Sequence, residues 1–136
     1  MKGVENLTFK FQQKCKLCEG ADETLGHLFF HCPVAADIWG QLLKCQGIIR
    51  PSWDWPTERV WMERHCGANG AHSIIYRMTL AGCIYQVWQE RNQVIFQGKK
   101  RTLSTIVRLI IQDVYYCASK KPKLARVLSM LNFYPC

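Results

Sequence analysis

The chain has 136 residues, of which 49% are apolar, and its 18 basic and 10 acidic side chains give a formal net charge of +8. A chain of this length buries roughly two thirds of its unfolded surface, so the composition excludes a disordered protein and predicts a single domain over residues 1–136. No window approaches the ~18 apolar residues of a membrane span, and residues 1–11 lack the apolar core of a secretory signal. We therefore expect a nuclear or cytoplasmic protein that is not secreted and has no membrane partner.

Eight cysteines are the next feature of the composition. In a reducing compartment they are poor candidates for a disulfide framework, although their even number would fit one in a secreted protein. Metal ligands and buried thiols are the interpretations that this compartment favours.

The first of these cysteines begin the pattern C-x2-C-x8-H-x4-C, formed by Cys15, Cys18, His27 and Cys32. Two cysteines in a tight turn reach one ion, and His27 and Cys32, about a turn and a half apart at the start of a helix, complete a tetrahedron. The spacing predicts one structural Zn²⁺ with no open position for water or substrate, which argues against metal catalysis. Buried thiols beside a core histidine are the alternative. His31 adjoins Cys32, and we expect it at the surface or beside the ligands.

The remaining histidines do not suggest a second site or a catalytic centre. His65 and His72 lack a second C-x-x-C partner, so a position in a loop or at a helix end is favoured over metal binding. Cys66 beside His65 resembles a nucleophile with its base, but adjacent side chains rarely point at each other and no orienting acid follows. We therefore expect no enzymatic activity and no small-molecule substrate.

The zinc pattern leads into an amphipathic helix, which completes a zinc-binding module over residues 12–46. Pro33 suits a first helical turn, and an apolar residue recurs every four positions until Gly47. Residues 47–56 then form a linker in which Trp53 and Trp55 pack over a core edge or, alternatively, stack on nucleic-acid bases. The residues expected to face the core of the helix are Val34, Ile38, Leu42 and Cys45.

Residues 57–133 are predicted to be helical. A short helix over 57–65 with Val60 and Trp61 inward precedes a long helix that ends near Gly98, a second long helix over about 103–117, and a short one over about 123–131. The connection at residues 98–101 is so short that the two long helices should pack antiparallel. The fold class is therefore mainly α: a zinc-binding loop leading into a helical bundle with a long antiparallel hairpin. The inward residues expected of the first long helix are Ile74, Met78, Ala81, Tyr85, Trp88, Asn92 and Ile95, and those of the second are Leu103, Val107, Ile110, Val114 and Cys117. The residues expected to broaden these buried faces are Ile75, Ile84, Val94, Ile106 and Ile111.

The positive charge is concentrated near the C-terminus, where residues 97–136 hold 8 basic residues and 1 acidic residue. Two clusters account for most of it, and both fall at expected helix boundaries. Such clusters contact phosphates, and they predict RNA or DNA as the partner, with a solvated surface that keeps the protein soluble as the alternative. The candidate nucleic-acid-binding residues are Lys99, Lys100, Arg101, Lys120, Lys121 and Lys123.

Two motifs give the chain a resemblance to a known family. Cys15–Cys18, Glu23–Thr24, His27–Pro33 and Ile38–Trp39 resemble the zinc-binding region at the C-terminal end of plant non-LTR (LINE-type) retrotransposon reverse transcriptases. The stretch Trp88–Phe96 is similar to the Trp-x-Glu-Arg-Asn-x-x-x-Phe segment that often follows that region. Within it, Glu90, Arg91 and Asn92 are adjacent and cannot all face one way, and the favoured interpretation is an ion pair and a buried amide that fix the hairpin. The order of the two motifs along the chain matches the family.

The resemblance implies a zinc module that helps a reverse transcriptase to hold RNA or DNA, with Cys15, Cys18, His27 and Cys32 as its ligands. It implies no polymerase activity, because the sequence lacks the paired-aspartate polymerase motif. The chain is expected to be a fragment of such a polymerase or a host protein derived from one. We consider two functions: a non-enzymatic nucleic-acid-binding domain, and an interaction or regulatory module that uses its helical faces to bind another protein or itself.

Overall fold

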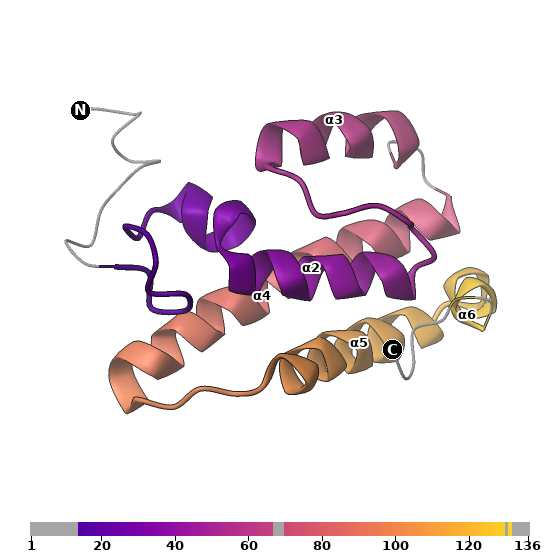
Figure 1. The fold of residues 1–136 in the computed structure, drawn as a ribbon. Helices are drawn as coiled ribbons and strands as arrows, with labels where there is room; N and C mark the ends of the chain where they lie inside the picture. Colours follow the sequence, from indigo (N-terminus) through magenta and orange to yellow (C-terminus); the bar gives the residue numbers. More distant parts are fainter. Residues whose placement is uncertain (1–13, 67–69, 130, 132–136) are drawn as a thin grey trace.

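The computed structural model describes residues 14–66, 70–129 and 131. Over these ranges the only β pairing is an isolated bridge between Lys14 and Asp22, so the predicted mainly α fold is confirmed. Residues 12–13 of the predicted zinc module, and residues 67–69, 130, 132 and 133 of the predicted helical region, lie outside the described residues. The elements in chain order (Figure 1) are the π-helical turn η1 (His27–His31) and the helices α2 (Pro33–Cys45), α3 (Trp55–His65), α4 (Ala71–Gln97), α5 (Leu103–Ser119) and α6 (Pro122–Leu128).

Helices α4 and α5 form the antiparallel hairpin that the sequence predicted, with α2 packed against both of them (Figure 1). Gly98 ends α4 in the left-handed region at φ 65°, where a side chain would be strained, and Thr102 begins α5 by accepting a hydrogen bond from the Thr105 N–H at 3.2 Å. At Gly82 the helices approach so closely that a Cβ atom would lie 3.3 Å from Ile110. The short connection and this small residue hold the hairpin together.

The side of α4 that is buried is not the predicted one. Ala81 and Tyr85 are exposed, and Ile74, Met78, Trp88, Asn92 and Ile95 are only partly covered. The prediction was wrong because the covered side includes polar groups, which a search for apolar periodicity passes over. Its buried residues are Ser73, Ile75, Tyr76, Thr79, Leu80, Cys83, Gln86, Val87, Glu90 and Arg91.

The other helices bury apolar stripes close to those expected. In places the buried residue is the neighbour of the one that the sequence predicted. Val34 is only half-buried while Ala35 and Trp39 are buried, and Cys117 is exposed while Ala118 is buried. In α6, Leu124, Val127 and Leu128 face the core, and the helix ends at Leu128. Leu131, expected inside that helix, lies beyond it and packs against the core from the outside.

The linker and α3 are held by a buried ion pair that the apolar pattern did not predict. Arg50 Nη2 donates to Glu58 Oε2 at 2.6 Å, and the same carboxylate accepts a bond from the Tyr76 hydroxyl. The Arg50 guanidinium also lies over Trp53 at 4.0 Å and over Trp61 at 4.4 Å. Glu58 is therefore the buried residue of α3, whereas Val60, expected inward, is 47% exposed.

A second buried ion pair joins the N-terminal module to α4. Arg91 donates to Glu23 twice, from Nε to Oε2 and from Nη2 to Oε1, each at 3.1 Å, and both side chains are more than nine-tenths buried. The neighbouring Glu90 instead accepts from Arg101 Nε at 2.8 Å and from the Arg101 backbone N–H at 2.8 Å. Adjacent residues of α4 thus fix the zinc-binding segment and the α4–α5 connection.

The described cysteines are mostly free thiols, as a reducing compartment would predict. Cys15, Cys18, Cys32, Cys66, Cys83 and Cys117 are free, and the structure departs from the expectation at Cys45, which is disulfide-bonded. None of the helices in the described ranges combines the length and apolarity needed to cross a membrane.

The Glu23–Arg91 pair predicts a specific pattern of stability changes. Arg91→Met leaves the Glu23 carboxylate buried without its partner, and it should lower the free energy of unfolding by about 3–5 kcal/mol. The double variant Glu23→Leu/Arg91→Met leaves no buried charge at this position, so its free energy of unfolding should fall by less than that of the single variant. Urea unfolding of the zinc-loaded protein, followed by circular dichroism, measures both.

Arg108→Met is the matched control, since Arg108 is an exposed arginine on α5. Its stability should stay within about 0.5 kcal/mol of the original protein. Equal effects of Arg91→Met and Arg108→Met would contradict the role assigned to the buried pair.

Candidate metal centre

The first two predicted ligands lie in a tight loop that the backbone closes on itself. The Cys15 N–H donates to the Ala21 carbonyl at 2.7 Å, and the Glu19 N–H donates to the Cys15 carbonyl at 2.8 Å. Glu19 adopts φ 57°, the left-handed region, and this turn lets the Gly20 N–H reach Cys18 Sγ at 3.4 Å. The loop therefore points both thiols toward one place.

The other two ligands are positioned by η1 and by the beginning of α2. The Thr24 hydroxyl accepts a hydrogen bond from the His27 N–H at 3.0 Å, which fixes the start of η1. Cys32 follows η1 in an extended conformation (φ −66°, ψ 128°) and caps α2, whose first residue is Pro33. The sequence predicted His27 and Cys32 on one helix; the structure instead separates them by a wider π-helical turn, closed by a bond from the Cys32 N–H to the His27 carbonyl.

These four side chains meet in space as the spacing predicted. Cys15 Sγ lies 3.8 Å from Cys32 Sγ, Cys18 Sγ lies 3.2 Å from His27 Nε2, and all four ligand atoms lie within 4.8 Å of one another. A tetrahedral zinc ion with bonds of about 2.0–2.3 Å needs donors roughly 3.5–3.8 Å apart, so the donor set fits one Zn²⁺. Cys15 and Cys32 are fully buried. With four protein donors the site is structural.

The electrostatics of the cluster also suit a metal. Burial lowers the pKa of His27, with a further contribution from His31, so its imidazole is neutral and able to coordinate near pH 7. Burial raises the pKa of Cys32 to about 12, against backbone N–H groups of Ala35 and Val34 that lower it. At Cys18 burial acts to raise the pKa, but hydrogen bonds from the Gly20 N–H and from Cys32 and Cys15 outweigh it and lower the pKa. Zinc uptake therefore displaces a proton from Cys32.

The other histidines lie at the surface or at helix ends, as the sequence predicted. His31 is exposed and lies outside the ligand cluster. His65 is the last residue of α3, where Nδ1 lies 3.0 Å from the Trp61 carbonyl and the ring stacks on Trp61. His72 is exposed in the first turn of α4. Across the residues that the structure describes, Cys15, Cys18, His27 and Cys32 form the one cluster able to hold a metal.

The six predicted nucleic-acid-binding residues do not form one surface. Lys99, Lys100 and Arg101 lie in the α4–α5 connection, near the zinc-binding loop, and the other three lie at the α5–α6 turn (Figure 1). The 17 residues of α5 separate the two groups by about 25 Å. Arg101 is engaged with Glu90, and Lys100 Nζ lies 3.7 Å from Glu19 Oε2. Lys120, Lys121 and Lys123 are all exposed.

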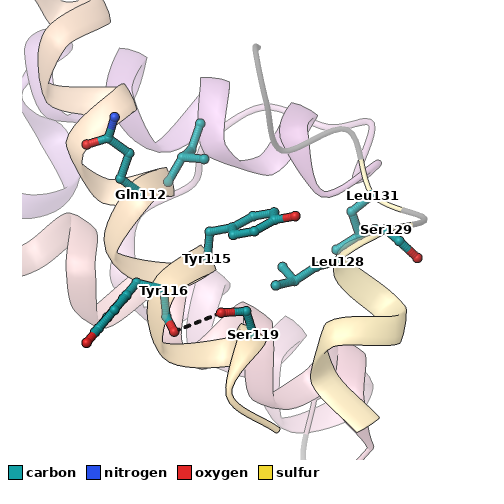
Figure 2. A pocket seen from close by; sticks show the side chains of 8 residues that line it. Gln112, Tyr115, Tyr116, Ser119, Leu128, Ser129 and Leu131 are labelled. Atoms are coloured by element: carbon teal, nitrogen blue, oxygen red, sulfur yellow. Dashed lines mark hydrogen bonds between the residues drawn. The ribbon is translucent and has the colours of Figure 1, made fainter. Parts of the chain in front are cut away.

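A pocket beside the α5–α6 turn was not predicted from the sequence. It has a volume of about 550 Å³ and is lined by Tyr115, Tyr116 and Ser119 of α5 and by Leu128 and Leu131 on the other side. Figure 2 shows the Tyr115 ring and the Leu128 side chain pointing toward each other across it, while Tyr116 points away. Lys120 Nζ lies 4.1 Å from the centre of the Tyr116 ring. The feature of the sequence that could have indicated this pocket is the pair of adjacent tyrosines, Tyr115 and Tyr116, which lysines follow closely.

Comparison with known proteins agrees with this geometry at the N-terminal part of the chain. Residues 2–39 match the family model described as zinc-binding in reverse transcriptase. The zinc-binding segment is therefore similar to the zinc-binding region of reverse transcriptases. The match covers less than a third of the chain, includes all four ligands, and ends before the Trp88–Phe96 motif. A search of curated proteins and a search of solved structures gave no match.

The zinc module should bind one zinc per chain, and the effects of replacing its ligands should differ from those of replacing a neighbouring histidine. Cys15→Ser and His27→Ala should lose the metal and increase hydrogen exchange over residues 14–45, because a structural zinc ion contributes about 10–16 kcal/mol in small zinc domains. Elemental analysis with hydrogen-exchange mass spectrometry measures both effects.

His31→Ala is the control for this experiment, since it removes an exposed imidazole next to a ligand. It should keep one zinc per chain and the original exchange pattern. Full zinc retention by Cys15→Ser and His27→Ala, or loss of zinc in His31→Ala, would overturn the ligand assignment.

Proposed function

We propose that the chain is a non-enzymatic nucleic-acid-binding domain derived from a LINE-type retroelement, stabilised by one zinc ion and acting in the nucleus or cytoplasm. The observation that carries the proposal is the group of three exposed lysines, Lys120, Lys121 and Lys123, at the α5–α6 turn beside a pocket lined by tyrosines. Phosphates bind such lysines, and unpaired bases stack on aromatic rings next to them. This combination favours single-stranded RNA or DNA.

The charge balance supports the α5–α6 turn over the zinc-binding end. Near the zinc-binding loop the acidic residues offset the basic ones: Lys14 pairs with Asp22, Lys100 with Glu19, and Arg101 with Glu90. Residues 97–136 contain Asp113 as their single acidic residue. A polyanion that approaches the α5–α6 turn therefore meets a region of the sequence in which basic residues outnumber acidic ones.

The metal centre supports a role that is structural and not catalytic. Its four donors all come from the chain, so the tetrahedron has no position for a water or a substrate. What the zinc ion supplies is a fixed loop geometry, and that loop is attached to α4 by Glu23 and Arg91.

A protein-binding or regulatory role is the second candidate, and it is favoured by the exposed aromatic side chains of α4. Tyr85 is 56% exposed and Phe96 is 78% exposed, although both belong to a long helix of the core hairpin. Exposed rings on a helix face mark surfaces that bind partners.

The nucleic-acid proposal is tested by removing the charges one group at a time. Replacing Lys120, Lys121 and Lys123 by Gln should weaken binding to a fluorescent single-stranded oligonucleotide and lower the slope of log K against log salt by about 2, since each phosphate contact contributes ~0.7. Lys99→Gln/Lys100→Gln should have a smaller effect. Fluorescence anisotropy between about 50 and 200 mM salt measures both.

A variant in which Lys44, Arg64 and Arg108 are all replaced by Gln is the matched control, because it removes three exposed charges from α2, α3 and α5. It should retain the original salt slope and most of the affinity. If it weakens binding as much as the lysine variant does, the interaction depends on net charge alone and the proposed site is wrong. If the original protein binds neither RNA nor DNA at low salt, the proposal fails altogether.

A further inference from the structure

The pocket beside the α5–α6 turn has an apolar floor and a polar opening. Ile111 and Leu128 are buried and form the floor, and the half-exposed ring of Tyr115 stands at one side, facing Leu128 (Figure 2). Its volume of about 550 Å³ lies within the range of roughly 300–1,000 Å³ that is typical of small-molecule sites. The exposed polar residues at its opening are Gln112, Ser119 and Ser129.

The charges near this pocket lie at its edge and not inside it. None of the lining residues that the structure describes is charged, whereas Lys120, Lys121 and Lys123 follow directly after Ser119 on the α5–α6 turn. Lys120 Nζ also lies 4.1 Å from the centre of the ring of Tyr116, a lining residue. An occupant that matches both features has a neutral, flat part within the pocket and a negative group outside it. A nucleotide of a single strand is divided in this way, into a neutral base and a charged phosphate.

We propose that this pocket binds one unstacked base of a single strand, a purine in preference to a pyrimidine, with the face of the base on the Tyr115 ring. The inference rests on the proposed function and names the part of the strand that the pocket recognises. The lysines hold phosphates of any sequence, whereas the pocket takes a base. Every base stacks on an aromatic ring, but the two fused rings of a purine cover more of Tyr115 and of the apolar floor than one ring does.

The hydroxyl groups at the pocket opening also favour a purine. Ser119 Oγ donates to the Tyr116 carbonyl at 3.1 Å (Figure 2), and Ser129 Oγ donates to the Arg126 carbonyl at 2.7 Å. Because each hydroxyl has one proton and uses it in this way, what it offers to a ligand is its lone pairs. The amino groups of adenine and guanine donate to such acceptors, whereas thymine has no amino group. Cytosine has an amino group but only one ring.

The experiment separates the contribution of the base from that of the phosphates. Short fluorescent strands of abasic nucleotides carry one base in the middle, which is adenine, guanine, cytosine or thymine, or no base at all. All strands have the same phosphates, so differences in their affinity for the zinc-loaded full chain measure the base alone. By fluorescence anisotropy at low salt, the adenine and guanine strands should bind about tenfold more tightly than the strand without a base, and the thymine strand about threefold.

Variants of the chain then assign this difference to the pocket. Tyr115→Leu keeps an apolar side chain but removes the aromatic face, so the tenfold difference should fall to about twofold or less, whereas Tyr115→Phe should retain it. Tyr85→Ala is the matched control, because Tyr85 is 56% exposed on α4 and does not line this pocket. It should leave every affinity unchanged. Replacing Lys120, Lys121 and Lys123 by Gln should weaken binding of all strands by the same factor.

The possible failures of the two proposals differ. If strands with and without a base bind equally well, or if thymine is preferred to adenine, the inference about the pocket is wrong while the phosphate contacts of the proposed function remain. A base effect that survives Tyr115→Leu, or that Tyr85→Ala abolishes, also overturns it, because the base then binds elsewhere. If neither these strands nor ordinary RNA and single-stranded DNA bind at low salt, the proposed function fails as well.

Discussion

The bidentate ion pair between Glu23 and Arg91 is the contact on which the arrangement of the whole chain depends. These residues are 68 positions apart, and their pairing fixes the zinc-binding loop to the C-terminal part of α4, near the connection to α5. Zinc alone would give a rigid loop without specifying where that loop lies. A buried carboxylate and a buried guanidinium have only one arrangement in which both are neutralised, so the pair selects one orientation of the module against α4.

The same logic explains why the interior side of α4 includes polar residues. Glu90 binds Arg101 in the connection to α5, and Tyr76 meets Glu58 of α3 with Arg50 behind it. Burial and the Glu58 contact raise the pKa of Tyr76, so it stays protonated and donates its bond across the physiological range. Apolar packing would let helices slide, whereas three such pairs fix the neighbours of α4 in register.

The sequence identified the metal ligands and the hairpin because each rests on local spacing. Four donors between Cys15 and Cys32 and a short connection after Gly98 leave few geometries. An ion pair at Glu90 and Arg91 was also expected, but the sequence did not indicate which partners they have or that they face the interior. Glu90 pairs with Arg101 and Arg91 with Glu23, and apolar periodicity does not reveal either contact. For the same reason the buried Glu58 was missed, and Val60 was placed inside although Arg50 and Tyr76 hold the carboxylate there.

The error about α4 has a physical cause. The four-three repeat from Ile74 to Ile95 lies opposite Thr79, Cys83 and Glu90, which are buried, yet Ile74, Met78 and Trp88 also pack against the core with part of their surface. Helix α4 contacts α2, α5 and α6, so a helix with this many neighbours is covered on more than one side. Apolar spacing then identifies only the sides that need no polar partner, whereas the most buried side is the one on which Glu90 and Arg91 find their partners.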